Sequence, residues 1–209
     1  MKYRYRNFID GKNNKTLVQK NSKKFILWGY KDSENLLNFS SQEELNKYYD
    51  KQGYNYLESD FFSKMYKIIS NNIKGRVLDI GCWTGMLYDY IDNKNNYLGF
   101  DLCSRAIEEA KKKNNSVFFI HDINDYSFPN IGFFDTLYIG GIFYYVTKKR
   151  ELLDKYIELF KPKRIVIQDI CTTSFHEFQD LITSKKNITI NFPGLNVERK
   201  NRQIIIIDL

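Results

Sequence analysis

Acidic residues follow or close several short apolar runs in this chain. Asp79 lies in VLDI, Asp101 closes YLGFD, and Asp122 comes two residues after VFFI. Gly140 and Asp169 stand at the ends of two further runs. A carboxylate accepts hydrogen bonds from hydroxyl and amine groups. If the runs are parallel strands, these residues gather in one crevice beyond the carboxyl ends of the strands, where such sheets bind ligands.

The loop after the first run carries a second signal. Residues 77–85 read VLDIGCWTG, so Gly81, Cys82 and Gly85 closely follow Asp79. Glycine is needed where the backbone takes unusual dihedral angles or lets a ligand come close. The stretch predicts a strand, a tight turn and a helix that begins near residue 86. The first amides of that helix would then be open to a polar or anionic group.

Strand-like and helix-like segments alternate through the rest of the chain. We expect strands from residue 77 and at 97–101, 117–120, 133–139 and 164–170, and helices at 59–72, 86–91, from 104, at 148–160 and at 174–184. This alternation predicts an α/β fold with a doubly wound, mostly parallel sheet. Two final strands, at 188–192 and 203–208, predict a closing hairpin.

The first 58 residues have a different pattern. They predict two short strands, at 4–9 and 15–18, and then a helix that starts at Ser40 or Ser41 and ends at Gly53. A serine followed by Glu43 and Glu44 is typical of a capped helix start. We therefore expect a lid or substrate-side segment at residues 1–58 and a cofactor-binding domain at residues 59–209.

The pattern D-x-G-x-x-x-G at residues 79–85 resembles motif I of the class I S-adenosylmethionine (SAM) methyltransferases. That family usually has a further glycine where this chain has Trp83. The resemblance spans about residues 61–209. It implies SAM as cofactor, a seven-stranded sheet with a C-terminal antiparallel hairpin, and an N-terminal helical lid. An NAD-type loop has the spacing G-x-G-x-x-G instead, so a nicotinamide oxidoreductase is disfavoured.

The resemblance also implies roles for single residues. Motif I would hold the methionine end of the cofactor, and Asp101 would accept hydrogen bonds from the ribose hydroxyls. Asp122 and its neighbours would bind the adenine. Gly140, after the fourth strand, would bind the amino group of the cofactor. The implied cofactor-binding residues are Asp79, Gly81, Cys82, Gly85, Asp101, Leu102, Asp122, Ile123 and Gly140. A turn role for Asp122 and a helix-capping role for Asp101 are the structural alternatives.

The catalytic groups are less well defined by the sequence. An alcohol acceptor needs a general base, whereas a neutral amine needs less help. Asp169 and His176 are our candidates for that base, with His121 behind them. Asp169 shows no partner carboxylates in the sequence, so we expect no metal site.

Composition leaves the acceptor open. The net charge of +7 suits an acidic or phosphate-bearing partner, yet no dense basic block marks a nucleic-acid groove. Three widely spaced cysteines and the lack of a signal peptide or membrane span predict a cytoplasmic protein. We expect a small-molecule or saccharide-like acceptor. An RNA methyltransferase that uses the basic N-terminal segment, or an inactive SAM-binding partner protein, are the alternatives.

Overall fold

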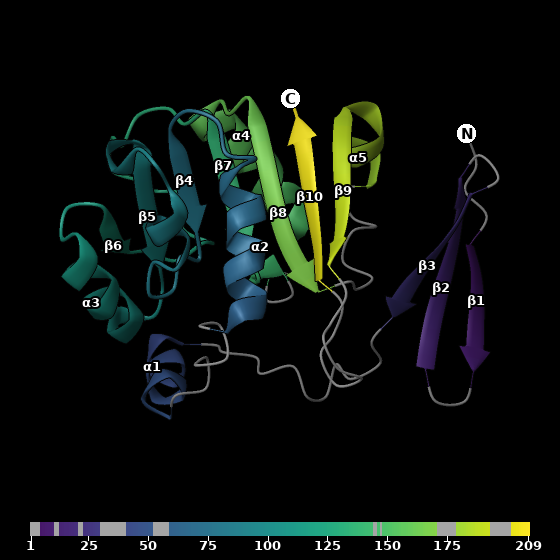
Figure 1. Cartoon of the computed structure of the whole chain (residues 1–209), viewed down its shortest axis with the longest axis horizontal. Helices are drawn as coiled ribbons and strands as arrows, with labels where there is room; N and C mark the ends of the chain where they lie inside the picture. The colour runs from purple at the N-terminus through teal and green to yellow at the C-terminus, as the bar shows by residue number, and fades with distance from the viewer. Residues whose placement is uncertain are drawn as a thin grey trace.

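The structure is a computed structural model of the chain. It describes residues 5–10, 13–20, 23–29, 41–51, 59–143, 146, 148–170, 179–192 and 202–209. The described strands form two sheets, one with seven strands and one with three. The larger sheet and its helices lie side by side as one body in Figure 1.

Seven strands lie in the order β6-β5-β4-β7-β8-β10-β9. They are β4 (Val77–Ile80), β5 (Tyr97–Asp101), β6 (Phe118–Ile120), β7 (Thr136–Gly140), β8 (Arg164–Ile170), β9 (Lys186–Phe192) and β10 (Arg202–Asp208). The first five in this order pair in parallel, and β10 is antiparallel to both β8 and β9. The predicted mostly parallel sheet with a closing antiparallel hairpin is confirmed.

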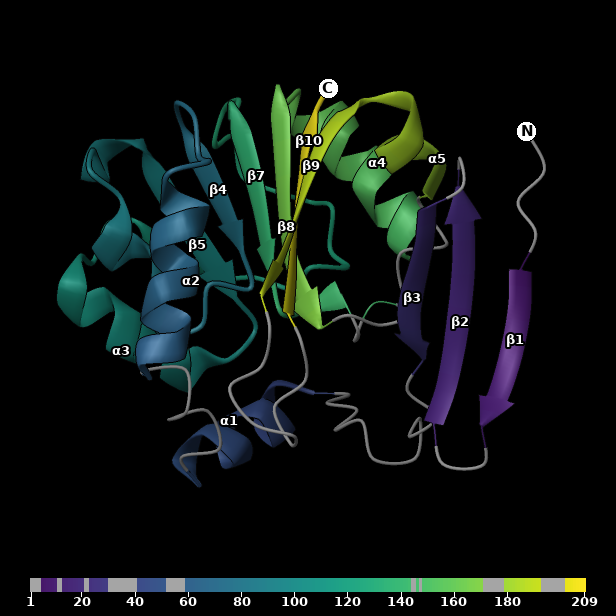
Figure 2. The same ribbon diagram turned by 45° about the vertical axis from the view of Figure 1, so that its right-hand side comes forward.

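Helices cover both faces of this sheet, as a second view shows (Figure 2). They are α2 (Asp60–Ser70), α3 (Ser104–Lys113), α4 (Lys149–Phe160) and α5 (Gln179–Ser184). One expected helix is absent: residues 86–91 contain a single 3-10 turn, Leu87–Tyr90. The prediction was wrong because the apolar residues there also fit one tight turn that buries Leu87 and Tyr88.

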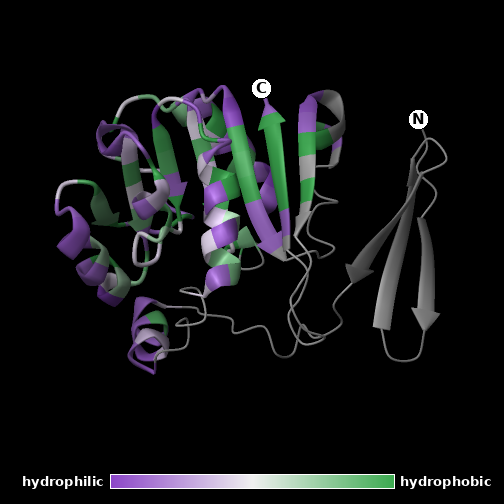
Figure 3. Cartoon of the chain, viewed as in Figure 1, coloured by the Kyte–Doolittle hydropathy of each residue, from purple (hydrophilic) through white to green (hydrophobic). Residues whose placement is uncertain are grey.

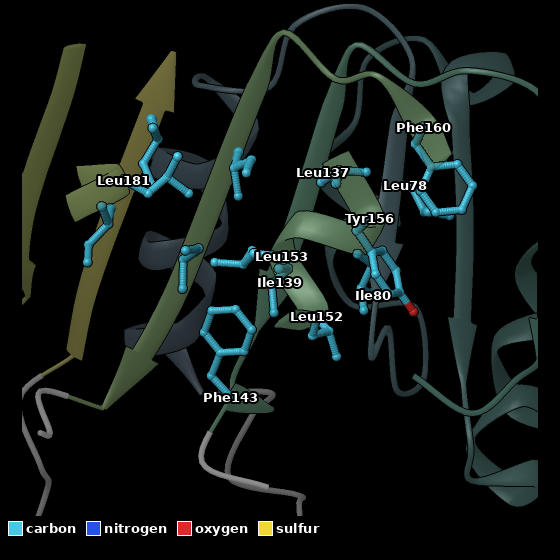
Figure 4. Close-up of a cluster of buried hydrophobic side chains, with 14 of the residues drawn as sticks. Leu78, Ile80, Leu137, Ile139, Phe143, Leu152, Leu153, Tyr156, Phe160 and Leu181 are labelled. Atoms are coloured by element: carbon cyan, nitrogen blue, oxygen red, sulfur yellow. The ribbon is translucent and has the colours of Figure 1, made fainter. Parts of the chain in front are cut away.

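The alternation of side chains along the strands fills two cores. Ile205 and Ile207 of β10 belong to the core under α4 and α5, while Ile204 and Ile206 belong to the core under α2 and α3. Figure 4 shows the first core, with Tyr156 and Phe160 of α4 over the strands. The central strands of the seven-stranded sheet accordingly carry long apolar stretches (Figure 3). Within the described residues, no helix is long and apolar enough to cross a membrane.

The N-terminal segment differs from the prediction in one respect. Its strands β1 (Tyr5–Asp10), β2 (Asn13–Lys20) and β3 (Lys23–Gly29) form the antiparallel three-stranded sheet, whereas the sequence predicted only two strands. The predicted helix is α1 (Gln42–Asp50), and Ser41 caps it by accepting a hydrogen bond from the Glu44 amide at 3.3 Å. It lies beyond the carboxyl ends of the parallel strands (Figures 1 and 2).

Candidate active site

The loop after β4 is held by the neighbouring strand. The amides of Gly81 and Cys82 both donate to the carbonyl oxygen of Phe100, at 2.9 Å, and the Gly85 amide donates to Cys82. These amides are therefore used within the fold. We predicted that an α-helix begins after this loop and presents open amides. That prediction was wrong, since no α-helix lies between β4 and β5.

The two glycines of this loop serve its packing. Both have positive φ, +77° at Gly81 and +68° at Gly85. A Cβ at Gly85 would lie 2.5 Å from the Phe118 ring, and one at Gly81 would lie 2.6 Å from Ile142. Larger residues would be strained in these conformations and would clash. The loop keeps a fixed shape because of these two positions.

Trp83 takes the conformation that glycine usually provides. Its φ is +50°, and its amide donates to Asp101 Oδ2 at 3.0 Å. Its indole ring lies 5.3 Å from the ring of Tyr49 in α1. A non-glycine residue in this region costs about 1–2 kcal/mol. The bond to Asp101 and the contact with Tyr49 offset part of that cost, so the loop tolerates the departure from the family pattern.

Asp101 joins two segments at the end of β5. Its Oδ1 accepts from the Cys103 amide at 2.8 Å, and its Oδ2 accepts from Trp83. Burial raises the pKa of this carboxyl, while the backbone amides that bond to it act in the opposite direction. Each carboxylate oxygen accepts more than one hydrogen bond. Asp101 therefore has the capacity to bind a pair of hydroxyls as well.

Asp79 is buried beside Tyr97. It is 1% exposed, and its Oδ2 accepts from the Tyr97 hydroxyl at 2.5 Å. Its Oδ1 has no hydrogen-bond partner among the described residues. Burial raises the pKa of Asp79 to about 7, against the lowering effect of the Tyr97 bond. A buried, unsatisfied carboxylate oxygen suits a cationic group such as the ammonium of an amino acid.

Helix α1 is attached to the start of α3. Gln42 Nε2 donates to the Leu102 carbonyl at 2.9 Å, and Asn46 Nδ2 donates to Ser104 Oγ at 2.9 Å. Asn46 Oδ1 also accepts from the Arg105 amide, at 3.2 Å. Asn46 thus caps α3, whose own N-cap residue, Cys103, makes no side-chain capping bond. The cap of α3 therefore comes from a side chain of another helix.

At the end of β6, Asp122 forms a local turn. Its Oδ1 accepts from the amide and the side chain of Asn124, at 2.9 and 3.1 Å. The carbonyl of Ile123 accepts from the Tyr156 hydroxyl at 3.0 Å, which ties the loop to α4. His121 Nε2 lies 2.7 Å from the Asp125 carbonyl oxygen. The turn role for Asp122 is realised, and its second oxygen stays available to a ligand.

The exit of β7 carries Gly140 and Gly141. Gly140 pairs in register with Gln168 of β8, and the Gly141 amide donates to the Gln168 carbonyl at 2.7 Å. Gln168 follows Val166 on the α2 face of the sheet, the face that Asp79 and Asp101 also share.

Asp169 lies apart from this group. It is 0% exposed and points to the opposite face, toward the core of α4 and α5, because it alternates with Gln168. The structure therefore does not bring Asp169 together with Asp79 and Asp101. His176 lies outside the described residues. Within the described part of the chain, no group of three or more acidic, histidine or cysteine residues is arranged to hold a metal ion.

Cys82 and Gln42 complete the description of the site. Cys82 is 4% exposed, and burial raises the pKa of its thiol well above the usual value, so it is a packing residue in motif I.

Gln42, Asn46 and Gln168 make or offer polar contacts that the sequence analysis did not predict. Gln42 and Asn46 carry no spacing signal, because their partners lie about sixty residues away. The position of Gln168 directly before Asp169 was the only available hint.

Comparison with known proteins agrees with this geometry. Residues 77–163 match the model of a methyltransferase domain. No curated protein matches the chain. The plantazolicin methyltransferase BpumL, in complex with a pentazolic desmethylPZN analogue and SAH, is 17% identical over 79% of this chain and 90% of that chain, with a TM-score of 0.52.

Two further solved structures have a similar fold. The N-methyltransferase NodS from Bradyrhizobium japonicum WM9, with S-adenosyl-L-homocysteine (SAH), is 14% identical over 78% of this chain and 97% of that chain, with a TM-score of 0.58. Magnesium protoporphyrin IX methyltransferase ChlM from Synechocystis PCC 6803, with SAM, is 12% identical over 80% and 97%, also with a TM-score of 0.58. At these identities the likeness concerns the fold. Residues 77–163 thus carry a methyltransferase domain, and the shared fold agrees with the resemblance of residues 79–85 to motif I of the class I SAM-dependent methyltransferases.

Proposed function

We propose that this enzyme methylates an amine or a hydroxyl of a small-molecule or saccharide-like acceptor, with the amine favoured. We favour the amine because neither Asp169 nor His121, the two candidate general bases among the described residues, is placed to act on an acceptor. Asp169 is fully buried on the far face of the sheet, and the ring of His121 contacts a backbone carbonyl in its own loop. A neutral amine needs no strong base, because it attacks with its own lone pair.

In this proposal the cofactor lies along the carboxyl ends of four neighbouring strands. Asp122, Leu102 and Ile123 would hold the adenine, and Asp101 the ribose hydroxyls. The free Oδ1 of Asp79 and the Gly140 carbonyl would hold the amino group. Gly81, Cys82 and Gly85 would shape the loop against the methionine end. The unsatisfied oxygen of Asp79 supports this placement, since a bound ammonium would satisfy it.

SAM, when bound, supplies an electrophilic methyl group on a sulfonium centre. Transfer of that methyl group to an acceptor nitrogen would form the N–C bond as the S–C bond breaks, leave SAH, and release the proton of the methylated nitrogen to water. The protein must therefore align the acceptor and exclude solvent, and it need not provide a charged group to stabilise the transition state. Helix α1 supports the second task, because it lies over the ends of the strands and contacts Leu102 and Ser104.

Calorimetric titration with SAM and SAH tests the cofactor site. We expect micromolar binding that the Asp101→Ala variant loses, while Asp92→Ala, an exposed carboxylate in a nearby turn, keeps it. The acceptor preference is then tested by methylation of D-glucosamine and D-glucose, which differ only in the amine. Turnover of D-glucose at an equal rate would contradict the preference for an amine.

A further inference from the structure

Among the described residues, one buried side-chain amide donor has no hydrogen-bond partner. Gln168 is 4% exposed, and its Nε2 has no hydrogen-bond partner among the described residues. Most buried polar groups in proteins are paired, and an unpaired donor lowers stability. A ligand that completes the bonding of such a group is one reason for its retention.

The surroundings of Gln168 leave room for a ligand atom. A Cβ at Gly141 would meet only Gln168 Oε1, at an ordinary contact distance of 3.8 Å. Gly141 has a φ of +66° and is held by its bond to the Gln168 carbonyl. Among the described atoms, a group of about methyl size at Gly141 would thus have Gln168 Oε1 as its nearest neighbour, so Gly141 leaves the end of the Gln168 side chain uncovered.

The strand order indicates which ligand this is. The proposed cofactor contacts come from β6, β5, β4 and β7, in that order across the sheet. Gln168 lies on β8, one strand further, which is about 4.8 Å beyond β7. It also faces the same side of the sheet as Asp79 and Asp101. Gln168 is therefore placed next to the end of the cofactor and on the side where the acceptor must enter.

We propose that Gln168 Nε2 donates a hydrogen bond to an oxygen of the acceptor that neighbours the methylated nitrogen. This inference rests on the proposed function and makes it more specific. It makes Gln168 a specificity residue and selects amines that are flanked by hydroxyl or carbonyl oxygens. An amino sugar has this chemistry, and a plain alkylamine lacks it.

The test compares the wild type with Gln168→Met, which keeps the length of the side chain and removes the donor. The matched control is Gln203→Met, on the neighbouring strand β10 but on the opposite face of the sheet. Three quantities are measured: the melting temperature, the affinity for SAH, and the affinity of SAH-saturated protein for D-glucosamine and cyclohexylamine. Methylation of both amines with SAM is followed in parallel.

We expect Gln168→Met to melt about 2–4 °C higher than the wild type, because an unpaired buried donor is removed. Its affinity for SAH should not change. Its affinity for D-glucosamine should fall at least about tenfold, toward that for cyclohexylamine, as one lost hydrogen bond predicts. Gln203→Met should keep the preference of the wild type.

A lower melting temperature for Gln168→Met would overturn the proposal, because the amide would then have a partner in the fold. Equal affinities for the two amines in the wild type, or no binding of either, would also overturn it. If the wild type binds D-glucosamine in a Gln168-dependent way but methylates neither amine, the proposed function fails and the inference about Gln168 stands.

Discussion

Asp79 shows how burial changes the chemistry of a single residue. Its pKa is raised from 3.8 to about 7, mainly by burial, and the Tyr97 hydroxyl limits the rise. Between these values the folded protein binds a proton that the unfolded chain has lost. The contribution of Asp79 to the free energy of unfolding therefore falls as pH rises from 4 to 7, by about 1.4 kcal/mol per pH unit, and is constant above pH 7.

This linkage gives a pH-dependent prediction. Asp79→Asn keeps an oxygen that accepts from Tyr97 but carries no buried charge. We expect the variant to gain stability relative to the wild type as pH rises from 4.5 to 7.5, measured by urea unfolding at each pH. Tyr97→Phe removes a bond that favours the ionised form, so it should lose stability most above pH 7. A constant difference between Asp79→Asn and the wild type across this range would contradict the assignment.

For single residues, the sequence predicted where the acidic side chains lie but not which side chains they contact. The positions of Asp79 and Asp101 at strand ends followed from the apolar runs, and both lie there. The bond between Asp79 and Tyr97, and the contact between Trp83 and Tyr49, depend on how strands and helices pack. No local pattern encodes such contacts, because their partners are 18 or more residues away.

Helix α1 is a short element whose position depends on a few polar contacts. None of its residues is buried, so apolar packing contributes little to its attachment. Asn46 alone bonds to Ser104 Oγ and to the Arg105 amide. Loss of a capping side chain typically costs about 1 kcal/mol. Asn46→Ala should therefore weaken the attachment of α1 to α3 while the sheet stays folded.

We expect Asn46→Ala to speed proteolytic cleavage within residues 42–50 and to weaken SAH binding about five- to tenfold. The physical reason is that α1 lies over the space beside Asp101, and the bound ribose would occupy that space. Lys47→Ala is the matched control, because Lys47 is exposed and pairs only with Glu43 of the same helix. Equal cleavage rates for the two variants would show that α1 does not depend on Asn46.

For helices and strands, the predictions were correct where the sequence pattern behind them was long. The strand at 164–170 was placed correctly because its run is continuous and apolar, as expected for a strand covered on both faces. The helix expected at 86–91 was wrong, since six residues do not distinguish an α-helix from a 3-10 turn. The strand β3 was missed altogether in the basic N-terminal segment.

Strand β10 contributes side chains to both cores of the seven-stranded sheet. Its isoleucines alternate between them, and Arg164 at the start of β8 bonds to Asp208 at the end of β10, at 2.7 Å. The sheet that presents Asp79, Asp101 and Gln168 is thus one packed unit. Ligand binding at its carboxyl edge should stabilise the entire domain by mass action, because the unfolded chain has no such site.

Thermal unfolding measures this coupling directly. At an SAH concentration of about 100 times its dissociation constant, the free energy of unfolding should rise by about 2.7 kcal/mol. For a chain of this size that corresponds to a rise in melting temperature of about 5–10 °C. NADH at the same concentration should give no rise, because the loop after β4 lacks the spacing G-x-G-x-x-G. Asp101→Ala should abolish the effect of SAH, while Asp92→Ala should preserve it. A rise with NADH would contradict the preference for SAM over a nicotinamide cofactor. An equal rise with SAH in both variants would mean that SAH does not bind at the end of β5.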